Sequence, residues 1–303
     1  MVLRPRIGIT GSSGMLGKHV VEFFLKKKYH VIASSRSNPK INKKNFLWKK
    51  LDLNEKNFTE KFKLYFKNIE CLIHIGAYVP KKNDKIDIKY IYNVNTKATV
   101  QLAKWSKKNK IHFIFISGSA IYKKDKKNIE SSKILNFSKN VYLNSKIKSE
   151  KKITKLSKKS NFKYTVLRPS SIYGAGIDKN KIISKYLKLT KLNKRLIIFD
   201  YDKTLVNFVH ANDIANAIYL CFILKKKGTF NLGSKTCHNF YDLSRKLKKI
   251  TKSKSQIDLV KTNKFKQLKS LDVNIDKSIK HLNWFPKIKL EKGLKMIVDN
   301  KWI

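Results

Sequence analysis

A glycine-rich turn near the N-terminus constrains the fold of this chain more than any other feature. The turn follows an apolar run at residues 7–10, opens an amphipathic stretch at Met15, and carries Gly11, Gly14 and Gly17. The first glycine permits a tight turn, the second lets the backbone approach a phosphate, and the third lets a helix pack closely on the strand. The free N–H groups of that helix favour an anion. The turn therefore predicts a pyrophosphate site, and a purely structural glycine turn is the alternative.

Short apolar runs alternate with amphipathic stretches through the first half of the chain. This alternation predicts a parallel sheet with helices on both faces, an α/β fold, and the nearly continuous apolar runs are typical of strands covered on both sides. Strands are expected at residues 7–10, 30–35, 71–77, 111–117 and 164–167, and helices at 15–28, 58–67, 86–108 and 142–157, with a polar loop at 123–138.

The pattern changes after Pro169, where loops lengthen and helices are expected to outnumber strands. We expect residues 1–168 to form a nucleotide-binding domain, to which 206–233 return. Residues 169–205 and 234–303 should form a smaller C-terminal substrate lobe at the carboxyl edge of the sheet, where ligands bind in such folds. Within this half, 199–210 should lead into a strand, and 213–225 and 290–302 should be helices.

The charge of the chain is strongly positive, with 69 Lys and Arg against 20 Asp and Glu and a net charge of +49. A polyanion partner such as nucleic acid or anionic lipid would explain this charge. However, the lysines are spread over nearly every segment and form no single block, which favours a compositional bias instead. A nucleic-acid partner is therefore not expected, although the positive field would attract anionic substrates.

Cysteine usage and hydropathy place the protein in a reducing, aqueous compartment. Cys71, Cys221 and Cys237 have neither metal-ligand nor redox spacing, so we expect buried apolar thiols and no metal site. Arg4 leads into the first strand without a signal peptide. The most apolar run, residues 214–224, falls short of the roughly 20 residues that span a bilayer, and should be a core helix. We expect a soluble, cytoplasmic protein.

The end of the second strand bears on the choice of dinucleotide. It lacks the carboxylate that would hold a ribose 2′-hydroxyl, and Arg36 stands where a 2′-phosphate would lie. This favours NADP over NAD, with a solvated surface Arg36 as the alternative. Asp52 and Leu53, at the end of the next short run, should meet the adenine, unless Asp52 instead caps the following helix.

Tyr142 and Lys146 form the predicted catalytic pair. Their spacing of four puts both side chains on one face of a helix, one turn apart. A free tyrosine titrates near pH ~10, and a neighbouring ammonium is expected to lower the pKa of the phenol. The tyrosine could then exchange a proton with a substrate hydroxyl or carbonyl while a hydride moves to or from the cofactor.

Together these motifs resemble the extended short-chain dehydrogenase/reductase family, in its NAD(P)-dependent epimerase/dehydratase branch. That resemblance implies a Rossmann-type, doubly wound parallel sheet. Further segments resembling family motifs are HIGA at 74–77, NT at 95–96, LRP at 167–169 with IYG at 172–174, FVH at 208–210 with DIA at 213–215, LNWFP at 282–286 and EKGL at 291–294.

The resemblance implies a homodimer with a four-helix interface and a nucleotide-linked sugar as substrate. Tyr142, Lys146 and a hydroxyl from Ser119 are the implied catalytic groups. The implied cofactor contacts are Gly11, Ser13, Gly14, Met15, Leu16, Gly17, Arg36, Asp52, Leu53, Ile75, Gly76, Ala77, Asn95, Ser117, Tyr142, Lys146 and Arg168.

Three departures from the family pattern affect the expected chemistry. Gly118 stands where the family places a catalytic Ser or Thr, so Ser119 or Ser117 would have to supply the hydroxyl. Ala120 occupies part of the acidic pair used by dehydratases, which argues against dehydration. Val206 replaces an arginine that contacts a diphosphate in many nucleotide-sugar epimerases.

These observations favour a keto-reductase or epimerase of a nucleotide-linked sugar. Arg36 favours reduction and the overall resemblance favours epimerisation. Two alternatives stay open: a reductase of a non-nucleotide carbonyl compound, and a non-catalytic basic protein that binds nucleic acid.

Overall fold

The computed structural model describes residues 5–81, 84–122, 127–135, 140–158, 160–200, 204–262 and 269–299. Arg4, parts of the predicted loop at 123–138 and the last residues of the predicted helix at 290–302 lie outside the described residues.

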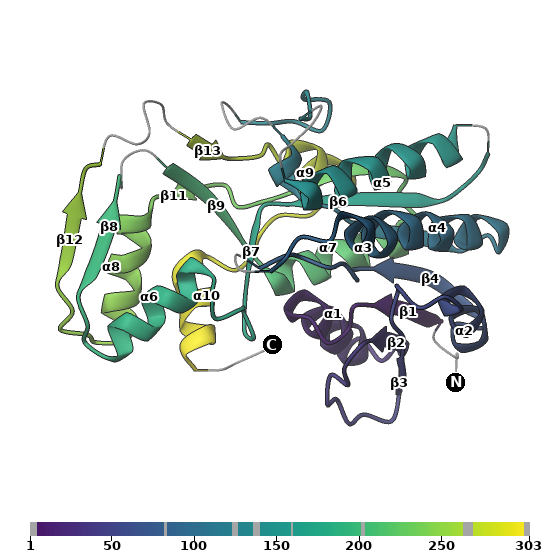
Figure 1. The fold of residues 1–303 in the computed structure, drawn as a ribbon, viewed down its shortest axis with the longest axis horizontal. Coiled ribbons are helices and arrows are strands. Elements are labelled where there is room, and N and C mark those ends of the chain that lie inside the picture. Colours follow the sequence, from purple (N-terminus) through teal and green to yellow (C-terminus); the bar gives the residue numbers. More distant parts are fainter. Residues whose placement is uncertain are drawn as a thin grey trace.

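Seven parallel strands form the central sheet, in the order β10-β6-β5-β4-β1-β2-β3 (Figure 1). Chain order reverses between β1 and β4, which places a switch point at the carboxyl end of β1, where doubly wound folds bind ligands. The strands are β1 (Arg6–Thr10), β2 (His30–Ser35), β3 (Phe46–Lys50), β4 (Ile69–His74), β5 (His112–Ile116), β6 (Tyr164–Pro169) and β10 (Gly228–Leu232).

Helices cover both faces of this sheet because alternate strand residues point to opposite sides. Ile73 packs in one core with α1 (Met15–Lys26) and α7 (Ala211–Ile223), whereas its neighbour Leu72 packs in the other. The second core is closed by α2 (Phe58–Tyr65), α4 (Ala98–Lys108) and α5 (Val141–Ser157). The predicted fold class is confirmed.

A smaller lobe lies to one side of the sheet (Figure 1). Its core includes Tyr173, Ile198 and Leu247. The lobe contains α6 (Ile182–Lys191), β8 (Leu196–Phe199), α8 (Phe240–Ile250), β12 (Ile257–Val260) and α10 (Leu290–Val298), and the connecting segments add β7 (Ser171–Tyr173), β9 (Thr204–His210), β11 (Cys237–His238), β13 (Lys269–Leu271) and α9 (Asp276–Leu282).

Two expectations for the second half need correction. In the described part after Pro169, seven strands accompany five helices, so helices do not outnumber strands. Most of these strands are only two to five residues long, too short to show a clear alternation of apolar and polar residues. Cys237 is half-buried, unlike Cys71 and Cys221.

After β9 the chain returns to the central sheet as β10, which pairs with β6. The apolar run at 214–224 lies largely in α7, whose side chains pack in the sheet core. In the described residues, no helix is long and apolar enough to cross a membrane.

Candidate active site

The glycine turn forms a cradle between β1 and α1. Gly11 has a φ of +76°, a left-handed conformation that favours glycine, and its backbone lies so close to Gly76 that a Cβ would approach within 2.6 Å of the Gly76 nitrogen. A Cβ on Gly17 would overlap the carbonyl oxygen of Gly11. α1 begins at Met15 without a side-chain cap, which leaves its first N–H groups to a ligand.

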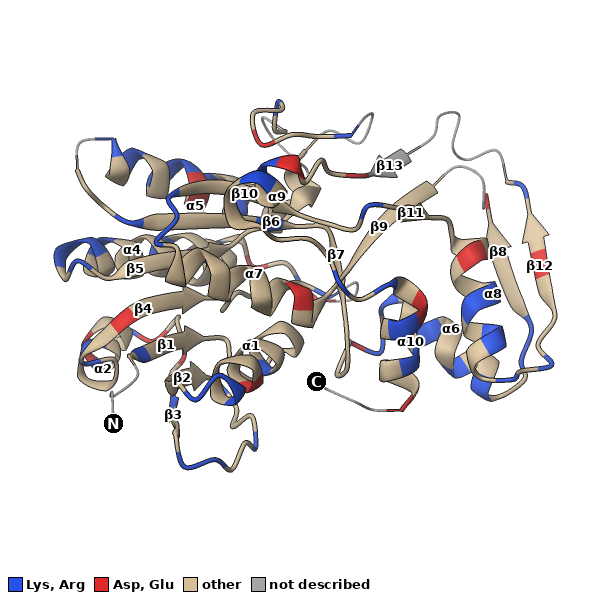
Figure 2. Ribbon diagram, turned by 180° about the vertical axis from the view of Figure 1, so that it is seen from behind, with Lys and Arg blue, Asp and Glu red and all other residues tan. Residues whose placement is uncertain are grey.

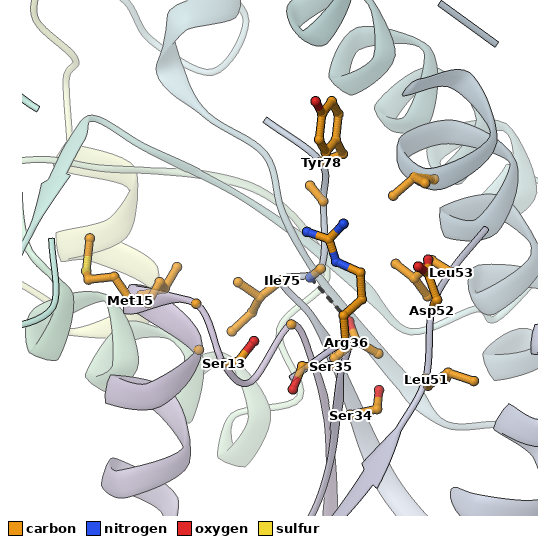
Figure 3. A pocket seen from close by; sticks show the side chains of 18 of the residues that line it. Ser13, Met15, Ser34, Ser35, Arg36, Leu51, Asp52, Leu53, Ile75 and Tyr78 are labelled. Carbon is orange, nitrogen blue, oxygen red and sulfur yellow. Dashed lines mark hydrogen bonds between the residues drawn. The ribbon is translucent and has the colours of Figure 1, made fainter. Parts of the chain in front are cut away.

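A cavity of about 290 Å³ opens above this cradle, at the carboxyl end of β1 (Figure 3). Most of the predicted cofactor contacts meet there, from four separate segments. They are Gly11, Ser13, Gly14, Met15, Leu16 and Gly17 from the turn, Arg36, Asp52 and Leu53 from the ends of β2 and β3, and Ile75, Gly76 and Ala77 after β4. The glycine turn would hold the phosphates of a dinucleotide, and the rest of the cavity lining, which is both polar and apolar, suits its sugar and base.

Arg36 lies at the rim of this cavity, with its guanidinium rising beside Asp52 and Leu53 (Figure 3). Its side chain is exposed, and Nη1 lies 3.4 Å from the hydroxyl of Tyr90. The neighbouring Ser35 hydroxyl is already engaged, since it donates to the Ser37 carbonyl and accepts from the indole N–H of Trp48. Arg36 is the one cation among the described residues that line the cavity.

Asp52 does not cap a helix, which excludes one of its two predicted roles. Its carboxylate accepts the N–H of Asn54 in a turn, whereas α2 begins only at Phe58 with Asn57 at its N-cap. Asp52 is among the residues that line the cavity, and its contact with an adenine stays a prediction.

A chain of hydrogen bonds fixes the floor of the cavity. The Thr99 hydroxyl donates to the carbonyl of Asn95, so it accepts from His74 Nε2 at 2.8 Å. His74 Nδ1 then accepts from the Thr10 hydroxyl at 2.7 Å. Burial, together with the charge of Lys146, lowers the pKa of His74 to about 3, which keeps the ring neutral as this chain of donors requires. The chain of bonds ties β1, β4 and α4 together.

Asn95 connects the cavity to the helix of the catalytic pair. It lies in a π-helical turn, Asn93–Lys97, a conformation that often marks functional sites. Its amide bonds both main-chain groups of Tyr78 and donates to the hydroxyl of Ser145 on α5. Asn95 does not line the described cavity, so its role here is to position Tyr78 and α5.

Tyr142 and Lys146 lie one turn apart on α5, as predicted. The ammonium of Lys146 is 5.8 Å from the centroid of the Tyr142 ring and donates to the carbonyl of Ile116 at 2.8 Å. Ile116 ends β5, so this bond holds the pair at the carboxyl edge of the sheet. The asparagine at the N-cap of α5, Asn140, accepts from the N–H of Leu143 and fixes the start of the helix.

The protonation states of the pair differ from the expectation. Burial raises the pKa of the Tyr142 phenol to about 12, so the expected lowering by Lys146 is not found. Burial also lowers the pKa of Lys146 to about 8, with the Glu150 carboxylate acting in the opposite direction. The cost of removing both groups from water exceeds their mutual effect at this separation.

Three residues after β5 lie where the family places a catalytic Ser or Thr, whose hydroxyl Gly118 lacks. Gly118 is extended, and a Cβ there would meet nothing within 4 Å. Ser117 is buried, and its hydroxyl has no partner among the described residues. Ser119 begins a short 3-10 turn and is partly exposed. There is thus space for a side chain at Gly118 and an unused hydroxyl beside it.

Arg168 has a different role from the predicted cofactor contact. Its guanidinium forms a buried ion pair with Glu150 at 2.5 Å and donates to the hydroxyl of Tyr122 at 2.7 Å. These bonds fasten β6 to α5, and Arg168 does not line the described cavity. The arginine of the family-like LRP segment therefore holds β6 against α5.

Several cavity residues were missed in the sequence. Tyr78 directly follows the HIGA segment and could have been included with it, but Tyr90 arrives from α3 (Ile88–Tyr92), which has no motif. The other additions are Thr10, Ser34, Ser35, Leu51 and Val94. Within the described chain, no group of three His, Cys, Asp or Glu side chains could hold a metal ion.

The sheet, the cradle and the Tyr–Lys pair define a class of enzymes that bind a dinucleotide at the switch point of a doubly wound fold. The chain belongs to the NAD dependent epimerase/dehydratase family, whose family model matches residues 7–233. It is thus an enzyme of the extended short-chain dehydrogenase/reductase type, which confirms the resemblance found in the sequence.

Relatives of similar length lie in the same family. A putative UDP-glucose 4-epimerase of Methanocaldococcus jannaschii is 24% identical over 306 residues, covering 96% of each chain. The UDP-glucose 4-epimerase of Thermotoga maritima, solved with UDP-glucose, has a TM-score of 0.84 at 24% identity, covering 97% of this chain and 98% of that one. The UDP-glucuronic acid 4-epimerase of Bacillus cereus, solved with NAD, has a TM-score of 0.82 at 22% identity, with the same coverage.

Proposed function

We propose that this enzyme acts on a nucleotide-linked sugar by hydride transfer assisted by Tyr142 and Lys146, as an epimerase or a keto-reductase. The observation that carries the proposal is the position of Lys146, whose ammonium donates to the carbonyl of Ile116 at the carboxyl end of β5. The cavity opens at the same carboxyl edge of the parallel sheet, which supports hydride transfer between a dinucleotide in the cavity and a substrate beside the pair, although neither Tyr142 nor Lys146 lines the described cavity.

A bound nicotinamide would supply the acceptor and donor of the hydride and, when oxidised, a positive charge. Tyr142 would take the proton of a substrate hydroxyl during oxidation and return it during reduction. Because burial raises its pKa in the ligand-free chain, we propose that the phenolate forms only in the assembled site. Lys146 would hold the ribose and stabilise that phenolate.

A hydroxyl is also needed beside the reacting oxygen, and we keep Ser119 as the predicted donor. The buried, unpartnered hydroxyl of Ser117 supports the alternative. Ala120, in place of an acid, supports epimerisation or reduction over dehydration.

We propose that the cofactor is NADP rather than NAD. Support comes from Arg36 at the cavity rim and from Ser34 and Ser35, which end β2 without a carboxylate. NAD in the Bacillus cereus relative favours the other choice. We also propose a cytoplasmic homodimer, as the resemblance implies, and light scattering of the purified protein would test the dimer.

The test is to denature the purified protein, identify any released dinucleotide, and then supply UDP-glucose to the native enzyme. An epimerase would retain its dinucleotide and form the epimer without consuming added cofactor. A keto-reductase would leave UDP-glucose unchanged. When supplied with a keto-sugar nucleotide instead, it would reduce that compound and oxidise NADPH. Failure to bind dinucleotide or to convert either substrate would contradict the proposal.

A further inference from the structure

A groove at the far end of the smaller lobe has no part in the proposed reaction. It lies between α8 and β12, the outermost strand of the lobe, well away from β1 and the dinucleotide cradle (Figure 1). Its lining combines four cations with an aromatic ring and two aliphatic side chains, and contains no acid. The lining residues are Tyr241, Arg245, Lys248, Lys249, Lys252, Ser253, Gln256, Ile257 and Leu259.

The four cations come from one face of α8 and its C-terminal turn, where Figure 2 shows a concentration of basic residues. Positions 245, 248, 249 and 252 follow the three- and four-residue spacing of a helical stripe. None of these four side chains is in an ion pair within the described residues, and the nearby Asp258 is paired with Arg195. Like charges at this spacing repel one another, so an anionic partner would stabilise the stripe.

The strand beside this stripe has an unused hydrogen-bonding edge. β12 pairs in parallel with β8, and the carbonyls of Gln256 and Val260 accept N–H groups from the β8 side. Alternate residues of a parallel strand present their main-chain groups to opposite edges, so Ile257 and Leu259 direct theirs outward. No described strand pairs with that outer edge.

The two faces of this small sheet differ in chemistry. The face turned toward α8 carries Ile257 and Leu259 beside the cations. The opposite face exposes apolar side chains, with 47% of Ile197, 56% of Phe199 and 37% of Val260 accessible, and it also carries Asp258, which is paired with Arg195. A strand added at the outer edge would therefore have a cationic surface on one side and would extend an apolar surface on the other.

We propose that this edge binds an extended peptide segment in which acidic and β-branched residues alternate. The segment would bond the main chain of Ile257 and Leu259 as a third strand, with its carboxylates facing Arg245 and Lys249. Its β-branched residues would lie on the opposite face, beside Val260 of β12. A second copy of this chain does not fit, because pairing through β12 would bring two α8 stripes of like charge together.

The probe is a short synthetic peptide that alternates glutamate and valine, carries a fluorophore and is titrated at physiological salt. We expect saturable binding that weakens roughly tenfold or more in the double variant Arg245→Glu/Lys249→Glu. The matched control is Lys151→Glu/Lys152→Glu, which makes the same charge change on the exposed face of α5 and should leave binding unchanged. Circular dichroism confirms that both variants fold.

Two further peptides separate strand addition from general attraction by a basic protein. A block peptide of the same composition, glutamates followed by valines, should bind weakly because its carboxylates cannot all face α8. A peptide methylated on alternate main-chain nitrogens should also bind weakly, because it cannot donate to the strand edge. The proposal would be overturned if either of these peptides bound as tightly as the alternating peptide, or if the α5 control lost as much affinity as the α8 variant. It would also be overturned if inorganic phosphate or a single-stranded oligonucleotide displaced the labelled peptide more effectively than the unlabelled alternating peptide does.

Discussion

The ammonium group of Lys146 donates a 2.8 Å hydrogen bond to the main-chain carbonyl of Ile116. This bond joins the middle of α5 to the last residue of β5, and it brings a cation into a site where Lys146 is only 4% exposed. The pair of Tyr142 and Lys146 is thus held at the sheet edge by contacts within the chain itself. The arrangement has a cost, because an ammonium is removed from water.

That cost should appear in the pH dependence of stability. Burial lowers the pKa of Lys146 from 10.5 to about 8, so the unfolded chain binds more protons than the folded chain between these values. The free energy of unfolding contributed by Lys146 therefore rises with pH in this window, by about 2 kcal/mol from pH ~8 to pH ~10. Urea unfolding of the ligand-free protein at the two pH values measures it. Lys146→Met should lack this rise, and identical pH slopes for the two proteins would contradict the account.

Alanine substitutions at two glycines of the cradle should differ in their effects on stability and on dinucleotide affinity. A Cβ on Gly17 would overlap the Gly11 carbonyl, so Gly17→Ala should lower the free energy of unfolding by about 1–3 kcal/mol and abolish dinucleotide binding. A Cβ on Gly14 would lie 3.4 Å from the same oxygen, so Gly14→Ala should fold normally and lose affinity only through contact with the phosphates. Calorimetry and fluorescence titration give both quantities. Equal stability of the two variants would count against the close packing of α1 on the turn.

Arg36 should decide the choice between the two dinucleotides. Arg36→Ala should weaken NADPH binding by roughly tenfold or more, because it removes a charged partner of the 2′-phosphate, and should leave NADH binding nearly unchanged. Nicotinamide fluorescence titrations with both cofactors provide the measurement. Tyr90→Phe, which removes only the neighbouring hydroxyl, is the control. Equal losses for NADPH and NADH in Arg36→Ala would show that Arg36 does not read the phosphate.

The open space at Gly118 predicts a gain of function. Gly118→Ser should fold at least as well as the natural chain, since the backbone is extended there and a side chain meets nothing within 4 Å. If the site lacks a well-placed hydroxyl, turnover should rise roughly tenfold or more. Steady-state rates of Gly118→Ser, Ser117→Ala and Ser119→Ala can be compared directly. Unchanged turnover in Gly118→Ser, with a large loss in one alanine variant, would show that a natural serine already supplies the hydroxyl.

The local signals in the sequence were strongest where backbone geometry demands a particular residue type. Gly11 and Gly17 could be interpreted from sequence because a positive φ and close packing of a helix on a turn leave almost no alternative. The spacing of Tyr142 and Lys146 likewise depends only on helix geometry. These features allowed the fold class, the glycine cradle and the helix on which Tyr142 and Lys146 lie to be predicted from the sequence.

Other features depend on contacts between distant segments and could not be predicted in this way. Tyr90 reaches the cavity through the path of α3, and Arg168 is occupied by Glu150, a partner that only the packing of β6 on α5 brings near. The raised pKa of Tyr142 follows from burial, which spacing alone does not give. The short strands of the smaller lobe depend on their neighbours because they have too few residues to show a period.

The central claim is that Tyr142 carries the proton while hydride moves between a bound nucleotide sugar and the nicotinamide. The most direct test is to mix the dinucleotide-loaded enzyme with UDP-glucose in a single turnover and follow the near-ultraviolet absorbance of reduced nicotinamide. The control is Tyr186→Phe, a buried tyrosine of the smaller lobe. We predict that Tyr142→Phe binds the dinucleotide with unchanged affinity but forms reduced nicotinamide about 10²–10⁴-fold more slowly than both the natural enzyme and the control. A normal rate in Tyr142→Phe would contradict the assignment.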